Sequence, residues 1–232
     1  MIPKNLTDNT VYFDIETSGL YNTLKDLKDN DPHLSDLWVK RCKWLQKNIE
    51  PGESSDPEDL WMNRSSLHPE FGRIVCVSFG FFTPEGTEKI VSFHGEDEKD
   101  ILEKTNKILA NTRSKGYKLG GQNIKNFDIP FLGKRMLINS ITPDPIIQTW
   151  NKKPWETSFI DLGEIFAFGA WGQTFSSLDL MSHVLGVPTS KDNLDGSKVH
   201  NSFWVEKAFE EIKDYCEKDV LCTMHCFKKI SS

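Results

Sequence analysis

The sequence predicts an α/β protein with a mixed β-sheet flanked by α-helices. Three β-branched and aromatic segments come first, at 10–16, 73–82 and 89–93. A Pro-Glu-Gly-Thr turn separates the second from the third, which indicates an antiparallel pair. A short apolar strand at 117–121 then precedes segments of helical periodicity. Strands that come first, followed by strand and helix in alternation, favour a sheet with helices packed on it.

The composition is that of an ordinary globular protein. The chain has 232 residues, of which 38% are hydrophobic and 27% are charged. Mixed α/β folds of this length commonly form one unit, so we expect a single domain over residues 1–232. Helices are expected at about 97–110, 127–138, 175–185 and 203–229, where apolar residues recur with helical periodicity. Ser176/Ser177 would open the helix at 175–185, and the helix at 203–229 has a possible break.

Residues 21–70 interrupt this pattern, and we interpret them as an inserted helical segment after the first strand. They hold two helix-like pieces, one with apolar side chains at helical spacing over 34–49 and one that starts near 54–59. Basic side chains could follow the phosphates of a nucleic acid strand or form a solvated helix face. In the first piece these are Lys40, Arg41, Lys43 and Lys47.

Charge and cysteine content exclude several classes of protein. The formal net charge of −6 argues against a nucleic-acid coat protein, although an enzyme can still grip a few phosphates locally. The five cysteines are an odd number and the N-terminus lacks an apolar signal stretch, so we expect free thiols and a cytoplasmic location. No apolar run approaches the roughly 18 residues of a membrane span, so no membrane partner is expected.

Asp14 and Glu16 form the first candidate site. Because they are two residues apart in a strand, their side chains leave the same face of the sheet. Two buried carboxylates are costly unless cations neutralise them, and divalent cations with oxygen ligands meet that need. Chance gives about one Asp-x-Glu triplet in such a chain, and a second one, Asp56/Glu58, reads as a helix start. Alone, the strand pair leaves a metal site and a coincidence equally open.

Two further acids follow later in the chain. Asp128 comes after a Gly-Gly strand end and before Pro130, so it lies near a helix start, where an aspartate more often caps the helix than binds a metal. Tyr215 and Asp219 are four residues apart and share a helix face, so the phenol and the carboxylate can point at one site. A tyrosine in the core is the alternative for this helix.

In this order the three motifs resemble those of the DEDDy 3′–5′ exonucleases of the ribonuclease-H-like fold. The likeness is to the exonuclease domain of family-B DNA polymerases and its stand-alone relatives, and it covers most of residues 10–230 outside the insertion. The segments that carry it are 13–17, 123–132 and 215–220, and those that extend it to the stand-alone group are 177–180, 183–188 and 195–199.

This resemblance implies hydrolysis of phosphodiester bonds from the 3′ end of single-stranded DNA, with release of nucleoside 5′-monophosphates by a two-metal-ion mechanism. Asp14 would bridge two Mg²⁺ or Mn²⁺ ions. Glu16 and Asp219 would complete the ion that activates water, and Asp128 would hold the other ion through bound water. Tyr215 would orient the attacking water as a neutral phenol.

The resemblance also implies contacts with the substrate through Thr17, Leu20, Asn123 and Phe127. Leu20 stands where related exonucleases place an apolar wedge between bases, and Phe127 could stack on a terminal base. Both side chains could equally belong to the core. RNA remains possible as a substrate, and DNA replication or repair, in a nucleoid or viral setting, is the expected context.

Three alternatives stay open. A catalytically silent nucleic-acid-binding module would keep the fold, although it would not need acids on a strand face. A proofreading subunit would act with a separate polymerase, since the chain ends soon after the third motif. A zinc site among Cys216, Cys222, His225 and Cys226 would lie on one helix without a C-x-x-C, so buried thiols are the stronger expectation. The lone His183 and His200 are expected to be structural.

Overall fold

A five-stranded mixed sheet forms the centre of the computed structural model, which describes residues 7–48, 54–153, 156–169, 176–189 and 196–231. The strand order is β3-β2-β1-β4-β5. β2 pairs antiparallel with β1 and β3, whereas β4 pairs parallel with β1 and β5. The mixed sheet and the antiparallel pair are as predicted. The strands are β1 (Thr10–Gly19), β2 (Gly72–Phe82), β3 (Glu88–His94), β4 (Lys118–Gly121) and β5 (Phe159–Asp161).

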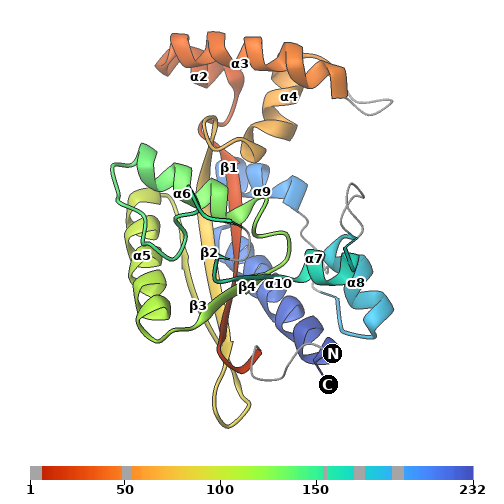
Figure 1. Ribbon diagram of the computed structural model, residues 1–232. Coiled ribbons are helices and arrows are strands. Elements are labelled where there is room, and N and C mark those ends of the chain that lie inside the picture. The colour runs from red at the N-terminus through yellow and green to blue at the C-terminus, as the bar shows by residue number, and fades with distance from the viewer. Residues whose placement is uncertain (1–6, 49–53, 154–155, 170–175, 190–195, 232) are drawn as a thin grey trace.

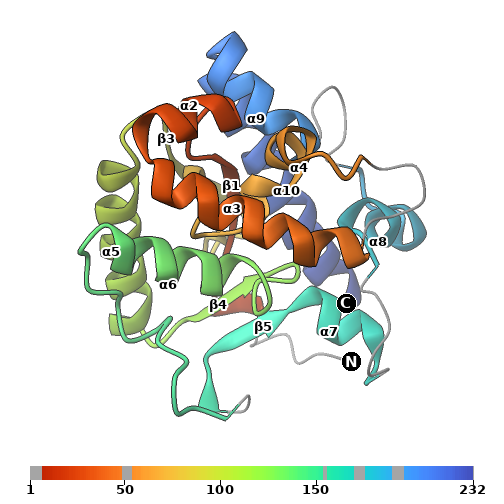
Figure 2. The same ribbon diagram turned by 90° about the horizontal axis from the view of Figure 1, so that it is seen from above.

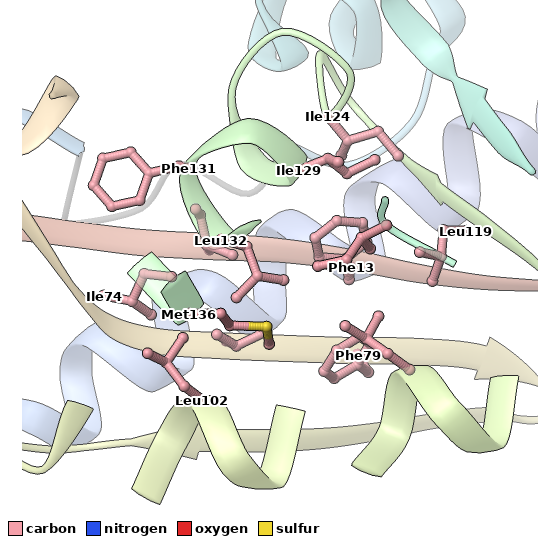
Figure 3. Close-up of a cluster of buried hydrophobic side chains, with 14 of the residues drawn as sticks. Phe13, Ile74, Phe79, Leu102, Leu119, Ile124, Ile129, Phe131, Leu132 and Met136 are labelled. Carbon is pink, nitrogen blue, oxygen red and sulfur yellow. The ribbon is translucent and has the colours of Figure 1, made fainter. Parts of the chain in front are cut away.

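One face of the sheet is covered by α5 (Glu98–Ser114) and α6 (Asp128–Ile138). Figure 3 shows Phe13, Phe79 and Leu119 from three neighbouring strands packed against apolar side chains of these helices. Burial of this continuous cluster fixes which way each strand faces, because alternate side chains of a strand leave opposite faces of the sheet.

The other face is covered by α10 (Phe209–Ile230), with α7 (Leu162–Ala167) and α8 (Leu178–Leu185) beside it (Figure 1). α10 approaches β2 closely at Gly80, where an added Cβ would lie 2.5 Å from the sulfur of Met224. The helix predicted over about 203–229 is broken, as the sequence suggests, at Lys207 and Ala208. Val199–Asn201 forms the short helix α9, Ser202–Glu206 forms a π-helical turn, and Lys207, with φ 55°, ends that turn.

The chain between β1 and β2 forms three helices in its described residues, and they lie at the top of Figure 1. They are α2 (Leu24–Asn30), α3 (Pro32–Leu45) and α4 (Pro57–Arg64). They bury a cluster of their own around Trp38 and Trp61, whose rings meet edge to face at 5.3 Å. Short 3₁₀ turns cover Gln46–Asn48, Ser65–Leu67 and, before α9, Gly196–Lys198. The helical insertion is therefore as predicted, with one more helix than expected.

The sequence missed α2, β5 and α7, because each is too short to show a period. α2 has seven residues and starts with a capping box between Thr23 and Asp26, in which each side chain satisfies the other's backbone N–H. β5 has three residues. β1 runs past the predicted end at 16, since Ser18 and Gly19 still pair with β2. The helix predicted at 175–185 corresponds to α8, whose N-cap is Ser177. Residue 175 lies outside the described residues.

Within the described residues, no helix combines the length and apolar character that crossing a membrane requires.

Candidate active site

β1 carries Asp14 and Glu16 toward α10. Phe13 and Ile15 alternate with them and are buried against α5 and α6, so burial of the apolar pair directs the acidic pair to the opposite face. Glu16 is 7% exposed, whereas Asp14 keeps more of its surface in contact with solvent. A β-bulge follows at once, because Glu16 lies opposite Cys76 and Thr17 opposite Ile74. Bulges re-aim side chains, and this one lies beside the two acids.

Asp128 reaches the same strand from α6. Its Oδ1 accepts a hydrogen bond of 3.1 Å from the backbone N–H of Ile15, and its side chain is 3% exposed. This contact is possible because β4 pairs with β1 only up to Tyr12, which leaves the next part of that edge of β1 without a strand. The N-cap position of α6 is Phe127, which makes no side-chain capping bond. The carboxylate of Asp128 thus binds the sheet instead of capping its helix.

Asp161, at the end of β5, orders the loop that leads to Asp128. Its carboxylate accepts hydrogen bonds from the backbone N–H groups of Asn123 at 2.9 Å and Lys125 at 3.1 Å. It also caps α7 through the N–H of Gly163 at 2.9 Å. Asn123 has φ 58°, a left-handed conformation that asparagine adopts more readily than most residues. Sequence reasoning missed Asp161 because its strand is so short, although Asp before a helical run is a capping signal.

α10 presents Tyr215 and Asp219 on one face, one turn apart, as the spacing predicts. Both are half-buried, and the phenol is hydrogen-bonded to the carboxylate of Asp219. The helix is held in register by Glu217, which accepts a hydrogen bond of 2.6 Å from Ser92 on β3. The helix therefore brings a phenol and a third acid to the face of the sheet that carries Asp14 and Glu16.

The four carboxylates act on one another electrostatically. The pKa of Asp14 is raised well above its ordinary value by burial and then by Asp128, Glu16 and Asp219. Burial also raises the pKa of Glu16, with Asp219 and Asp128 adding to the effect. The pKa of Asp128 is raised to about 7, mainly by burial, although the Ile15 hydrogen bond opposes the change.

The phenol of Tyr215 belongs to the same electrostatic group. Its pKa is raised by burial and then by Asp219, Glu16 and Asp14. Acids from β1, α6 and α10 therefore lie near enough to raise one another's pKa values, and Asp14, Glu16 and Cys216 form the tightest group among the described residues.

Cys216 lies against this group. Its Sγ, one oxygen of Asp14 and one of Glu16 are all within 4.8 Å of one another. The thiol donates to the carbonyl oxygen of Asp14 at 3.5 Å and to its Oδ2 at 3.6 Å. Burial and the neighbouring thiol of Cys76 raise the pKa of Cys216, so it stays protonated. Because only a thiolate is a good metal ligand, Cys216 serves here as a hydrogen-bond donor that orients Asp14.

The four residues predicted to contact substrate have other partners in this structure. The Thr17 hydroxyl donates to the carbonyl oxygen of Ser66 at 2.8 Å. Leu20 packs against the cluster of the insertion. Asn123 Oδ1 accepts a hydrogen bond from Asn126 at 2.9 Å. Phe127 is half-buried beside Phe131, with 5.4 Å between ring centroids, and lines a cavity. Of the four, Asn123 and Phe127 lie on the loop that leads directly to Asp128.

The C-terminal cysteines behave as expected. All five cysteines are buried thiols, and Cys216, Cys222 and Cys226 lie on the continuous helix α10. His225 instead contacts Glu88 at 2.7 Å. In the part of the chain that the structure describes, these residues form no group with metal-ligand geometry apart from the one that contains Asp14, Glu16 and Cys216.

His200 is structural, as expected, and ties α9 to the end of β1. Its Nδ1 accepts a hydrogen bond of 3.1 Å from the N–H of Gly19, and its Nε2 contacts the carbonyl oxygen of Asn22 at 2.9 Å. His183 lies exposed on α8. Asp195, at the start of the segment 195–199, lies outside the described residues.

The strand order, with helices on both faces, defines a ribonuclease-H-like α/β fold with an acidic site on its central strand. The chain belongs to the family described as predicted 3′–5′ exonucleases related to the exonuclease domain of PolB, whose model matches residues 65–232. The match includes Asp128, Tyr215 and Asp219, and it begins after β1. The relationship to the polymerase exonuclease domain that the motifs predict is thereby confirmed.

The fold is similar to that of the family B DNA polymerase from the hyperthermophilic archaeon Pyrobaculum calidifontis. The TM-score is 0.57 at 16% sequence identity, over 95% of this chain and 24% of the polymerase chain. The chain thus corresponds to less than a quarter of that polymerase, and at this identity the likeness concerns the fold alone. Among curated proteins no match to the chain is found.

Proposed function

We propose that this protein is a metal-dependent 3′–5′ exonuclease that removes nucleoside 5′-monophosphates from single-stranded DNA. The observation that carries the proposal is the convergence of carboxylates from β1, α6 and α10, each raising the pKa of others. Repulsion among buried acids costs free energy, and a fold retains such a group most simply when cations neutralise it in use.

The chemistry of the donor atoms suits two divalent cations such as Mg²⁺ or Mn²⁺. Asp14, Glu16, Asp128 and Asp219 offer carboxylate oxygens, which are the ligands that these hard cations prefer. Oδ1 of Asp128 is held by Ile15, which leaves Oδ2 for a cation or its bound water. When bound, the cations would lower the pKa of a water molecule and neutralise charge at the scissile phosphate.

The chain's own residues would position the reacting groups. Tyr215 stays a neutral phenol, because its raised pKa keeps the proton on oxygen across the physiological range. A neutral phenol can both donate and accept a hydrogen bond, so it can hold the attacking water in line with the phosphate. Cys216 and Ile15 would fix the directions of Asp14 and Asp128 through the hydrogen bonds already described.

The test is release of mononucleotides from single-stranded DNA and RNA that carry a label at the 5′ or the 3′ end. The purified chain is incubated with Mg²⁺, Mn²⁺ or EDTA. We expect stepwise shortening from the 3′ end that needs metal and is lost in Asp14→Asn but retained in Asp100→Asn, a control on the exposed face of α5. Binding without any cleavage, in every metal, would favour a silent binding module instead.

Proofreading beside a separate polymerase is a second candidate, favoured by the family's relationship to PolB and by the likeness to a polymerase chain. It predicts that a primer with a mismatched 3′ end on a template is shortened faster than a matched one. Equal rates on the two primers would argue against this role and leave degradation of single strands as the activity.

A further inference from the structure

A groove lies between the insertion and the start of α6, and one of its lining residues, Phe127, directly precedes Asp128. Its cavity measures about 450 Å³. Arg41 of α3 lies on one side, Leu67 and His68 follow α4, and Phe127 and Lys134 belong to the α6 side. In the view of Figure 2, α3 and α6 run in similar directions, and residues of both line the groove. We call these five residues the α3/α6 groove.

Positive charge gathers in this groove although the whole chain carries a net charge of −6. The pKa of His68 is lowered by burial and then by Arg41, and Lys134 and Arg64 act in the same direction. Arg41 and Lys134 line the groove together with His68. Glu70 opposes them and pairs with Lys134 at 3.0 Å, at positions where both side chains are about half exposed, so water screens that pair.

Flat and apolar side chains accompany the charges. The guanidinium of Arg41 lies 4.3 Å from the ring centroid of Trp44, and this tryptophan is 52% exposed. Leu67, in the groove itself, is 45% exposed. The cation–π contact stabilises this arrangement by about 0.5–1 kcal/mol at an exposed site, and the exposed ring offers a stacking surface for a base. Cations interleaved with exposed aromatic rings are typical of surfaces that bind single-stranded nucleic acid.

On the α6 side the groove starts at the end of the helix where Asp128 lies. Phe127, Phe131 and Lys134 are four and three residues apart, so they form one stripe on the helix, and Phe127 directly precedes Asp128. In a 3′–5′ exonuclease the terminal nucleotide occupies the site, and the rest of the strand extends away in the 5′ direction. Because the groove-lining Phe127 directly precedes Asp128 in the chain, the groove is the candidate path for that part of the strand.

We propose that the α3/α6 groove binds the single-stranded nucleic acid on the 5′ side of the scissile bond, with Arg41 and Lys134 on its phosphates and Trp44 stacked on a base. The inference rests on the proposed function and extends it, because it gives the helical insertion the task of gripping the strand. Two phosphate contacts are enough to guide a strand without making the protein a general nucleic-acid binder.

The experiment measures binding of a fluorescent single-stranded DNA dodecamer by anisotropy, with Mg²⁺ and in an Asp14→Asn background that leaves the DNA intact. The double variant Arg41→Ala/Lys134→Ala is compared with Lys104→Ala/Lys107→Ala on α5. The control pair removes the same charge from exposed positions outside the groove, and Lys104, like Lys134, has an exposed acidic partner.

We expect the groove variant to bind about tenfold more weakly, and its slope of log K against log salt to fall by about 1.4, at roughly 0.7 for each lost phosphate contact. The control should bind as the parent does. Trp44→Ala should weaken binding without changing the slope, because stacking releases no counterions.

Equal affinity and slope in the groove and control variants would overturn the inference, and the groove would then suit an acidic segment of a partner protein. This failure is distinct from failure of the proposed function. A wild-type chain that releases no nucleotide in any metal refutes the exonuclease, whereas the binding measurement needs no turnover.

Discussion

The carboxylate of Asp128 holds the backbone N–H of Ile15 at 3.1 Å, across 113 residues of sequence. The bond joins the first residue of α6 to the strand that carries Asp14 and Glu16. One acid of the site is thus fixed directly to the backbone between Asp14 and Glu16.

This bond predicts a difference between two substitutions at position 128. Asp128→Asn keeps an oxygen acceptor for Ile15, whereas Asp128→Ala leaves a buried N–H without a partner, which costs about 1–3 kcal/mol. Urea unfolding in EDTA should therefore show that Asp128→Ala is less stable than Asp128→Asn by that amount. Both variants should lose nucleotide release. Equal stability of the two would mean that the bond contributes nothing to the fold.

The raised pKa of Asp128 predicts a pH dependence of stability without metal. Its folded pKa of about 7 exceeds its ordinary value of 3.8, so the folded state binds the proton more tightly than the unfolded state. The resulting stabilisation is complete below about pH 4 and is lost as the pH rises through about 7. The stability of the wild type in EDTA should therefore fall relative to Asp128→Asn over this range. The raised pKa of Asp128 would be contradicted if, in thermal melts, the stability of the wild type relative to Asp128→Asn stayed constant or increased as the pH rises.

Tyr215→Phe should slow hydrolysis while leaving the fold and Mn²⁺ binding intact, because only the hydrogen bond of the phenol is lost. The loss of one positioning contact should lower kcat by about 10²–10³. The matched control is Tyr117→Phe, which makes the same change at a half-buried tyrosine outside the site. Calorimetry that shows lost Mn²⁺ affinity in Tyr215→Phe would instead make the phenol part of the metal site.

Arg135→Met should destabilise the protein by about 3–5 kcal/mol, because it leaves Glu98 charged and buried. Arg135 is 4% exposed, and its guanidinium bonds Glu98 at 2.6 and 2.9 Å and the carbonyl oxygen of Pro69 at 2.9 Å. Lys134→Met, next to it, removes an exposed ion pair and should cost at most about 1 kcal/mol. Chemical denaturation that gives equal losses for the two would contradict the importance of burial.

Gly121→Ala should impair activity by displacing the loop before Asp128. An added Cβ would lie 2.8 Å from the carbonyl oxygen of Phe13 and would also collide with Ile124, and neither neighbour is the flexible end of a long side chain. We expect a loss of about 1–3 kcal/mol in stability together with a lower kcat. Gly133→Ala, on α6 with open space around the new methyl group, is the control and should be tolerated.

The sequence predicted those parts of the site that depend on a regular period. Alternation in β1 placed Asp14 and Glu16 on one face of the strand. The helical repeat placed Tyr215 and Asp219 on one face of their helix. Asp161 could not be found in this way, because its role depends on backbone N–H groups 36 and 38 residues away. The hydrogen bond to Ile15 was hidden for the same reason, since β4 must first end and expose that edge of β1.

The convergence of the acids is tested most directly by diffraction from crystals soaked with Mn²⁺ and a nucleoside 5′-monophosphate. The account predicts anomalous scattering peaks within about 2.6 Å of carboxylate oxygens of Asp14 and Glu16, with the nucleotide phosphate bound to the same ions. Peaks elsewhere on the surface, with these carboxylates making no contact to metal, would contradict the central claim.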